Sequence, residues 1–154
     1  MIFPDNAFKY ASSIERHFPV YKAAPSSSES AEPSPKEQIL ADLVENSRNE
    51  HNTWEHDQLA AAMTTDRKPL VIDVRSPDAY AKQHIAGAVN IPVADLVARQ
   101  AELPAGRDAP IVTACFRGNM SLTGMLVLQS LGYSNVRSLN GGTIGWAEQD
   151  LPTG

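Results

Sequence analysis

The alternation of short apolar strands with helical segments, from about residue 51 onward, constrains the fold of this chain most. PLVIDV (69–74) and APIVTA (109–114) are compact runs rich in β-branched residues, typical of strands buried on both faces of a parallel sheet. Helical patterns lie between these strands, which indicates an α/β domain with a mostly parallel sheet. Right-handed crossovers would place the helices on both faces of that sheet.

Local signals position the remaining elements. Ser76 and Pro77 stand where the N-cap and first residue of a helix over 76–84 would lie. Gly132 would end a helix over 121–132. Apolar or long side chains that roughly share one face of this helix are Leu122, Met125, Leu126, Gln129 and Leu131. The other expected elements are a helix at 57–63, an amphipathic helix at 94–103, a helix at 143–150, and strands at 88–92 and 135–139.

The first 50 residues differ in character from the rest and are expected to form an N-terminal extension to a domain over 51–154. Residues 25–35 read PSSSESAEPSP, which cannot bury a core and predicts a linker or disordered segment. Residues 36–50 look helical, with an apolar face of Ile39, Leu40, Leu43 and Val44. A short helix near Asp5–Arg16 is a further possibility, so the extension is expected to be partly helical.

Composition excludes several classes of function. A formal net charge of −5 argues against nucleic acid as the main partner, since phosphate binding favours a basic face. A single cysteine excludes an internal disulfide and any cysteine cluster for a metal, so no metal and no cofactor are expected. No apolar run approaches the roughly 20 residues that cross a bilayer, and the N-terminus lacks the pattern of a secretory signal. We therefore expect no membrane partner and a cytoplasmic protein.

The lone cysteine stands where an open parallel sheet binds ligands. The expected strand at 109–114 ends directly in Cys115, and Phe116, Arg117, Gly118, Asn119, Met120 and Ser121 lead from it into a helix. Gly118 permits a sharp turn, after which successive backbone N–H groups can form an anion-binding nest beside a helix N-terminus. Both effects would stabilise a thiolate, or a persulfide, on Cys115. A buried cysteine acting as a small hydrophobe is the alternative.

Four motifs in sequence order resemble those of the rhodanese-like domain family, and in particular of its compact single-domain thiosulfate sulfurtransferases. They are LVIDVRSPDAY (70–80), HIAGAVNIP (84–92), CFRGNMS (115–121) and GGTIGW (141–146). The third resembles the family's Cys-x-x-Gly-x-x-Ser active loop, and the last its closing Gly-Gly-x-x-x-Trp. The resemblance covers about 100 residues, 51–154, and leaves the first 50 outside it.

The resemblance implies a central, mostly parallel five-stranded sheet and a persulfide cycle. Cys115 would be the nucleophile that takes the sulfane sulfur from thiosulfate or a related donor, then passes it to a thiol or cyanide. Backbone N–H groups from Phe116 to Ser121 would cradle the transferred sulfur. Because the chain holds no second cysteine, the acceptor must be external, either a small molecule or a protein.

This sequence departs from many family members at two loop positions. Phe116 and Met120 stand where Arg or Lys is common, so Arg117 is the one cation in the loop. Arg117 either binds the sulfonate end of the donor or faces solvent. Asp73 and Arg75, after the first core strand, either shape the active loop or form a structural ion pair. Ser121 and Asn119 either hydrogen-bond within the loop or cap the helix, and His84 is expected to fix a turn rather than act as a base.

Two other functions compete with sulfur transfer. A phosphatase of the same fold needs an arginine six positions after its cysteine to clamp phosphate, but position 121 is serine. The residue before the nucleophile is also Ala114 and not histidine, which disfavours that chemistry. The second alternative is a non-enzymatic sulfur carrier or regulatory module that binds a protein partner, with residues 1–50 as its docking element.

Overall fold

A computed structural model describes residues 32–34, 37–38, 40–41, 44–45 and 52–154 of this chain. The described residues between 37 and 45 are helical, in agreement with the expected helix over 36–50. Ile39 and Leu43 of its expected apolar face lie outside the described residues, as do the suggested helix near Asp5–Arg16 and most of the 25–35 linker. The proposed division of the chain at residue 50 stays a prediction.

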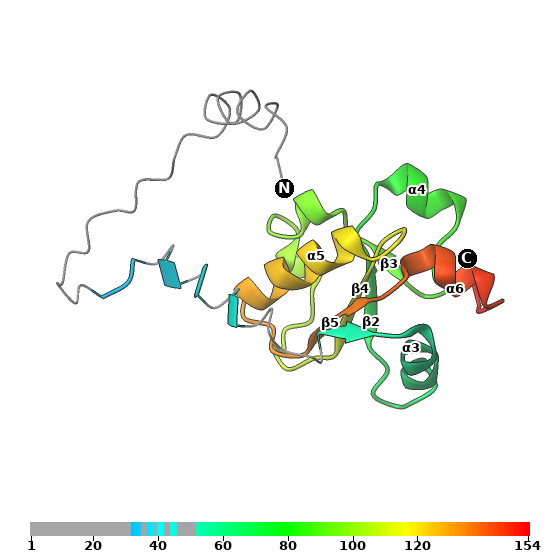
Figure 1. The fold of residues 1–154 in the computed structure, drawn as a ribbon, viewed down its shortest axis with the longest axis horizontal. Coiled ribbons are helices and arrows are strands. Elements are labelled where there is room, and N and C mark those ends of the chain that lie inside the picture. Colours follow the sequence, from blue (N-terminus) through cyan, green and yellow to red (C-terminus); the bar gives the residue numbers. More distant parts are fainter. Residues whose placement is uncertain (1–31, 35–36, 39, 42–43, 46–51) are drawn as a thin grey trace, which may run out of the picture. The chain divides into compact units, whose positions relative to one another are not determined.

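The domain is built on a five-stranded sheet in the order β1-β5-β4-β2-β3, and every adjacent pair is parallel (Figure 1). The strands are β1 (Thr53–Trp54), β2 (Leu70–Asp73), β3 (Val89–Asn90), β4 (Ile111–Ala114) and β5 (Val136–Leu139). The α/β class and the parallel sheet are therefore confirmed. The order places β4, whose four residues are all buried, at the centre.

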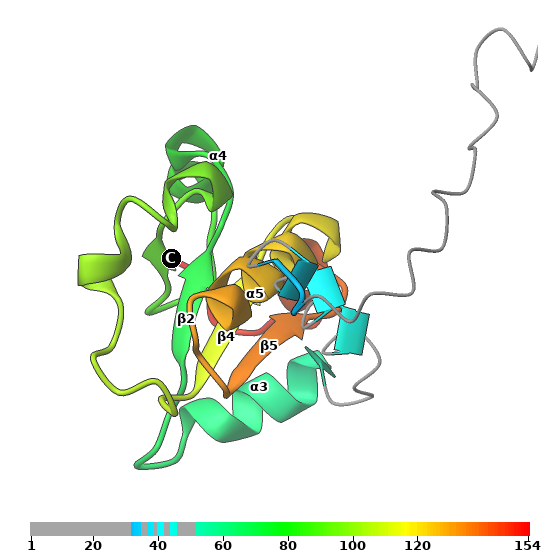
Figure 2. The ribbon, with the colours of Figure 1, turned by 90° about the vertical axis from the view of Figure 1, so that its left-hand side faces the viewer.

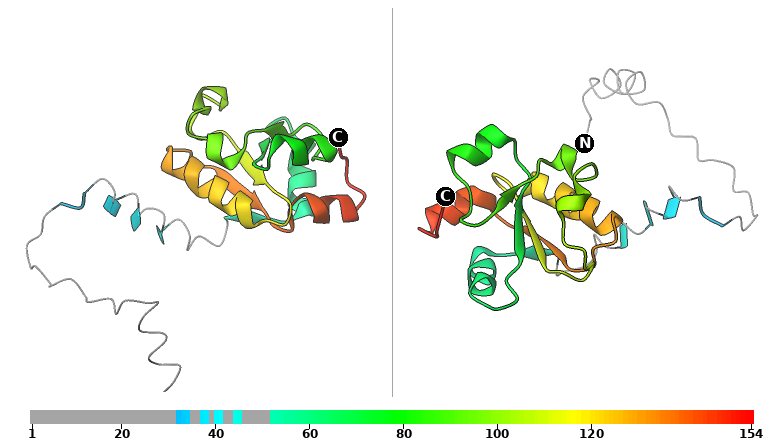
Figure 3. Two further views of the ribbon diagram at one scale, coloured as in Figure 1. Left: turned by 90° about the horizontal axis from the view of Figure 1, so that it is seen from above. Right: turned by 180° about the vertical axis from the view of Figure 1, so that it is seen from behind.

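Helices cover both faces of the sheet (Figures 2 and 3). They are α3 (His56–Met63), α4 (Pro77–Lys82), α5 (Asn119–Ser130) and α6 (Gly142–Glu148). Side chains alternate along each strand, so the sheet has a core on either side. Ile72 and Ile111 pack with Met125 and Leu128 of α5. On the other side, the core consists of Leu59, Val71, Ile85, Ala88, Val112, Ala114, Leu139 and Trp146.

The helix starts and stops follow the expected local signals. Ser76 is the N-cap of α4, where its hydroxyl accepts a hydrogen bond from the Ala79 amide, and Pro77 is the first helical residue. Gly132 follows α5 with a φ of +92°, a conformation that glycine adopts at little cost. The buried face of α5 is Ser121, Gly124, Met125 and Leu128. Of the residues expected to share one face, Met125 is fully buried but Leu122 is 43% exposed, so the two do not lie on the same face.

The expected amphipathic helix at 94–103 was also wrong. This segment forms two 3₁₀ turns, Val93–Asp95 and Gln100–Glu102, joined by further turns. Leu96 and Leu103 are its two core residues, and such a sparse apolar face leaves little packing energy to maintain a continuous helix. The element that sequence reasoning did not place is β1, whose two residues pair with β5.

Candidate active site

The candidate nucleophile lies at the carboxyl end of the central strand. β4 ends at Ala114, Cys115 follows directly, and α5 begins at Asn119, two residues before the expected start (Figure 1). Gly118 is the N-cap of α5 with a φ of +105°, so the chain reverses within three residues of Cys115. The turn aims the Gly118 amide at the cysteine, and this N–H donates a hydrogen bond to Sγ over 3.1 Å.

Cys115 is buried by its residue surface, at 3% exposure, yet it lines an open cavity of about 260 Å³. The other lining residues are Arg75, Phe116, Arg117, Asn119 and Met120. The structure thus gathers most of the predicted loop, together with Arg75, around one sulfur. The Cys115 sulfur accepts a hydrogen bond, lies beside the N-terminus of α5 and borders a cavity. These features favour the role of a nucleophile for Cys115 over that of a small hydrophobic core residue.

Ser121 does not line the cavity but stabilises the loop through hydrogen bonds in the protein interior. Its fully buried hydroxyl donates to the Gly118 carbonyl over 2.7 Å and lies 2.8 Å from the hydroxyl of Ser138 in β5. The Thr113 hydroxyl of β4 donates to the Ser121 carbonyl over 2.8 Å. For Ser121, the alternative of a hydrogen bond within the loop is confirmed. The helix-cap alternative for Ser121 and Asn119 was wrong, because Gly118 holds that position.

The carbonyl side of the loop is held by the start of α6. The Thr143 amide donates to the Cys115 carbonyl over 2.7 Å, and the Ile144 amide donates to the Phe116 carbonyl over 3.2 Å. Gly142 makes this approach possible, since a Cβ there would lie 2.2 Å from the Cys115 carbonyl oxygen. The Gly141-Gly142 pair of the last motif therefore allows the first turn of α6 to hydrogen-bond to the backbone of Cys115 and Phe116.

His56 contacts the first turn of α6, and the sequence did not indicate this role for it. Its buried ring lies 3.0 Å through Nε2 from the Gly142 carbonyl and 2.8 Å through Nδ1 from Nε2 of Gln149. Because a carbonyl oxygen only accepts, Nε2 carries the proton, and Nδ1 accepts from the Gln149 amide. The ring also meets the edge of Trp146, with centroids 6.3 Å apart. No local signal in the sequence links residue 56 to residue 142.

Asp73 and Arg75 form a buried ion pair beside the cavity. Arg75 donates through Nε to Oδ1 of Asp73 over 2.9 Å and through Nη2 to Oδ2 over 2.6 Å. Nη2 also donates to the Gln83 carbonyl over 2.6 Å, and the Asn90 side-chain amide donates to the backbone carbonyls of both partners. The structural ion pair is confirmed, and the position of Arg75 on the cavity wall also connects the pair to the site.

Four of the loop residues that line the cavity are exposed to solvent: Phe116, Arg117, Asn119 and Met120. Phe116 and Met120 are 51% and 45% exposed, and Arg117 is exposed as well, with its guanidinium carbon 5.4 Å from the centroid of the Phe116 ring. His84, in contrast, is absent from the cavity lining. Its Nδ1 lies 2.9 Å from the Tyr80 carbonyl, and its ring stacks on the Tyr80 ring. This position fits the expected role in a turn.

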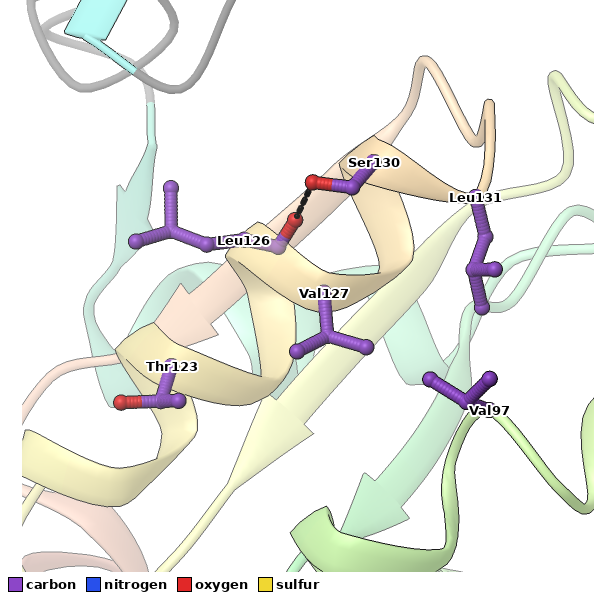
Figure 4. A pocket seen from close by; sticks show the side chains of 6 residues that line it. All are labelled: Val97, Thr123, Leu126, Val127, Ser130 and Leu131. Carbon is purple, nitrogen blue, oxygen red and sulfur yellow. Dashed lines mark hydrogen bonds between the residues drawn. The ribbon is translucent and has the colours of Figure 1, made fainter. Parts of the chain in front are cut away.

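A second cavity, of about 360 Å³, lies along α5 and the segment after β3 (Figure 4). Val97 and Leu131 point toward each other across it, and Val127 projects into the same hollow. The Ser130 hydroxyl on its rim donates to the Leu126 carbonyl over 2.9 Å. This cavity is larger than the one at Cys115, but no titratable side chain lines it, so covalent chemistry is assigned to the smaller cavity.

Within the part of the chain that the structure describes, no group of three or more His, Cys, Asp or Glu side chains is arranged to hold a metal ion. No described helix is both long enough and apolar enough to cross a membrane. The absence of a cofactor and the cytoplasmic location remain predictions.

Residues 55–149 match the family model of the Rhodanese-like domain. The chain is 41% identical over 80 residues to the thiosulfate sulfurtransferase GlpE of Pseudomonas entomophila, covering 50% of this chain and 69% of that relative. It is 31% identical over 101 residues to a sulfurtransferase of Allochromatium vinosum, covering 66% and 92% of the two chains.

Among solved structures, the fold is similar to that of a rhodanese-related protein from Thermoplasma volcanium, with a TM-score of 0.59 and 27% identity. The similarity covers 67% of this chain and 97% of that one. The resemblance inferred from the four sequence motifs is thus confirmed. With the family match spanning more than half of its length and enclosing the Cys115 loop, this chain belongs to the rhodanese-like domain family.

Proposed function

We propose that this protein is a sulfurtransferase of the thiosulfate sulfurtransferase type, which moves a sulfane sulfur through a persulfide on Cys115. The observation that carries the proposal is the hydrogen bond from the Gly118 amide to Cys115 Sγ at the wall of an open cavity. Membership in the rhodanese-like domain family supports it, as do relatives named as sulfurtransferases.

The proposed first half-reaction loads the enzyme. The Cys115 thiolate attacks the outer sulfur of thiosulfate, a bond forms between the two sulfurs, and the sulfur–sulfur bond of thiosulfate breaks. Sulfite leaves as a dianion with the electron pair of that bond, and the outer sulfur keeps its own negative charge as the terminal sulfur of the persulfide. The Gly118 N–H and the N-terminus of α5 lie where they favour negative charge on this sulfur.

The second half-reaction transfers the sulfur onward. A thiolate or cyanide attacks the terminal sulfur of the persulfide, and the Cys115 thiolate is regenerated as the leaving group. Cys115 is the single cysteine of the sequence, so this acceptor comes from outside the chain. The proposed partners are therefore a small sulfane-sulfur donor and an external thiol, and the cycle requires no cofactor.

Following thiocyanate formation from thiosulfate and cyanide tests the proposal, with Cys115→Ala as the variant that lacks the nucleophile. We expect turnover that depends on Cys115, together with a mass increase of one sulfur atom after thiosulfate alone. Loading without turnover would instead support the sulfur-carrier function. If the wild-type chain shows neither loading nor turnover with any sulfane-sulfur donor, the proposed function is wrong.

A further inference from the structure

The mouth of the Cys115 cavity is unusually apolar for a site that receives a small divalent anion. Phe116 and Met120 line it, and both are about half exposed. Both are among the seven large hydrophobic side chains that are exposed in the described residues. Phe116 and Met120 lose contact with water when an apolar group covers them, which favours a ligand that carries one.

The cationic charge available to a ligand in this cavity is small. Arg75 faces a buried carboxylate, since Asp73 accepts from both Nε and Nη2 at 2.6–3.1 Å. The positive charge of Arg75 is therefore largely compensated before a ligand arrives. Arg117 lines the same cavity, and its guanidinium lies over the Phe116 ring. One available guanidinium matches a singly charged anion better than the doubly charged thiosulfate.

The size of the cavity points the same way. Its volume of about 260 Å³ approaches the roughly 300 Å³ at which small-molecule sites begin, and thiosulfate, a single sulfonate joined to one sulfur, leaves much of it empty. Space beside the reacting sulfur and next to exposed apolar side chains is space for a carbon group. Placing a strongly hydrated divalent anion there would instead require it to lose water against apolar walls.

We propose that the preferred donor is a singly charged anion whose sulfane sulfur is carried by an apolar organic group. This inference rests on the proposed sulfur transfer and specifies its substrate class. The organic group covers Phe116 and Met120, while the anionic end lies toward Arg117 and the Gly118 N–H. With a thiosulfonate, the Cys115 thiolate bonds to the terminal sulfur, the sulfur–sulfur bond breaks, and the organic sulfinate leaves with its electron pair.

Two thiosulfonates with the same reacting atoms test this proposal. Persulfide loading of Cys115 is measured with benzenethiosulfonate and with methanethiosulfonate, and each rate is divided by that of a small free thiol with the same donor. This division removes the intrinsic reactivity of the two donors. We expect the normalised kcat/KM to favour the benzene derivative by about tenfold, the equivalent of about 1.4 kcal/mol.

Variants assign the preference to the named side chains. Phe116→Ala and Met120→Ala should each reduce the ratio of the normalised kcat/KM for benzenethiosulfonate to that for methanethiosulfonate severalfold. Val97→Ala, which shortens an exposed apolar side chain outside this cavity, should leave the ratio unchanged. Phe116→Arg should raise kcat/KM for thiosulfate, because it adds a cation at the mouth. Thermal unfolding of each variant checks that it folds.

The possible failures are distinguishable. A normalised ratio near one in the wild-type chain, or a ratio that neither alanine variant changes, would overturn the apolar-donor proposal while leaving Cys115-dependent sulfur transfer intact. Absence of loading from thiosulfate and from both thiosulfonates would overturn the proposed function itself, and with it the assignment of the donor.

Discussion

At the residue scale, Cys115 combines burial with access. Its backbone carbonyl accepts from Thr143, its side chain accepts from Gly118, and the sulfur still borders a cavity. Because these hydrogen bonds do not require sulfur as such, Cys115→Ser should fold with a melting temperature close to that of the wild type, yet show no thiocyanate formation. Circular dichroism and the cyanide assay check the two parts. An unfolded serine variant would contradict the placement of the sulfur at a cavity wall.

Arg117 offers a second test at this scale, because its charge lies at the cavity while its side chain is exposed. Arg117→Ala should raise the KM for thiosulfate by roughly a factor of five and change kcat less, as the loss of an exposed charged contact would. Arg67→Ala removes the same charge from the exposed turn after α3 and should change neither constant. A KM that Arg117→Ala leaves unchanged would show that this guanidinium does not contact the donor.

A comparison of Gly142 with Gly132 distinguishes two reasons for a glycine: a positive φ and the close approach of another backbone segment. Both have positive φ, +60° and +92°, but a Cβ at Gly142 would meet Cys115 and Phe116 backbone atoms at 2.2–2.6 Å, whereas nothing lies within 4 Å of one at Gly132. Gly132→Ala should therefore cost about 1 kcal/mol of unfolding free energy, and Gly142→Ala at least about 2 kcal/mol more. Urea unfolding measures the difference. Equal losses would show that the backbone at Gly142 moves away from the loop.

At the element scale, α3 stabilises the nucleophile loop through α6: His56 of α3 contacts the Gly142 carbonyl, and the first turn of α6 hydrogen-bonds to the Cys115 carbonyl. His56→Ala removes the buried side-chain hydrogen bond to the Gly142 carbonyl and opens a gap beside Trp146, so we expect a loss of about 2–3 kcal/mol in unfolding free energy. Slower persulfide loading should accompany it, because the turn at Gly142 contacts the Cys115 carbonyl. Glu148→Ala, at an exposed position on α6, is the matched control. Unchanged loading in a folded His56→Ala would separate this histidine from the site.

The elements differ in how far the sequence could predict them. β2 and β4 are marked by dense β-branched runs, and α4 by its Ser-Pro start, so local chemistry was sufficient. β1 has two residues and owes its state to pairing with β5, more than 80 positions away, which no local pattern reveals. The expected helix at 94–103 was wrong for the opposite reason. Its apolar spacing suits a helix, but only Leu96 and Leu103 of this segment enter the core.

The same contrast holds for the site. The Cys115 loop was predictable because the nucleophile, the turn glycine and the helix start are neighbours in the sequence. Its supports were not, because His56, Ser138 and the start of α6 are distant from Cys115 in the sequence and contact the loop only through the tertiary fold. Even the Asp73–Arg75 pair, whose partners are adjacent in sequence, could be resolved into a buried ion pair on the cavity wall only from its geometry.

At the scale of the whole molecule, the boundary of the domain is decided by its edge strand. The family match begins at residue 55, but the sheet begins at Thr53. The Ser138 amide donates to the Asn52 carbonyl over 2.8 Å, and the Asn140 amide donates to the Trp54 carbonyl over 2.9 Å. Trp54 also packs against the core beneath α3 and α6. The smallest stable unit should therefore include Asn52, and a chain that lacks β1 would leave the edge of β5 unpaired.

Two truncations test this boundary. A chain of residues 51–154 keeps β1 and should retain kcat/KM for sulfur transfer within roughly a factor of two of the full chain, the small effect expected for changes away from the chemistry. A chain of residues 56–154 loses the pairing of β1 with β5 and the packing of Trp54, so its melting temperature should fall by about 10 °C or more, at roughly 4–8 °C per kcal/mol for a domain of this size. Calorimetry measures both chains. If the two truncated chains have the same melting temperature, β1 contributes nothing to stability. If the chain of residues 51–154 loses activity, residues 1–50 take part in the transfer, because this chain keeps both β1 and the Cys115 loop.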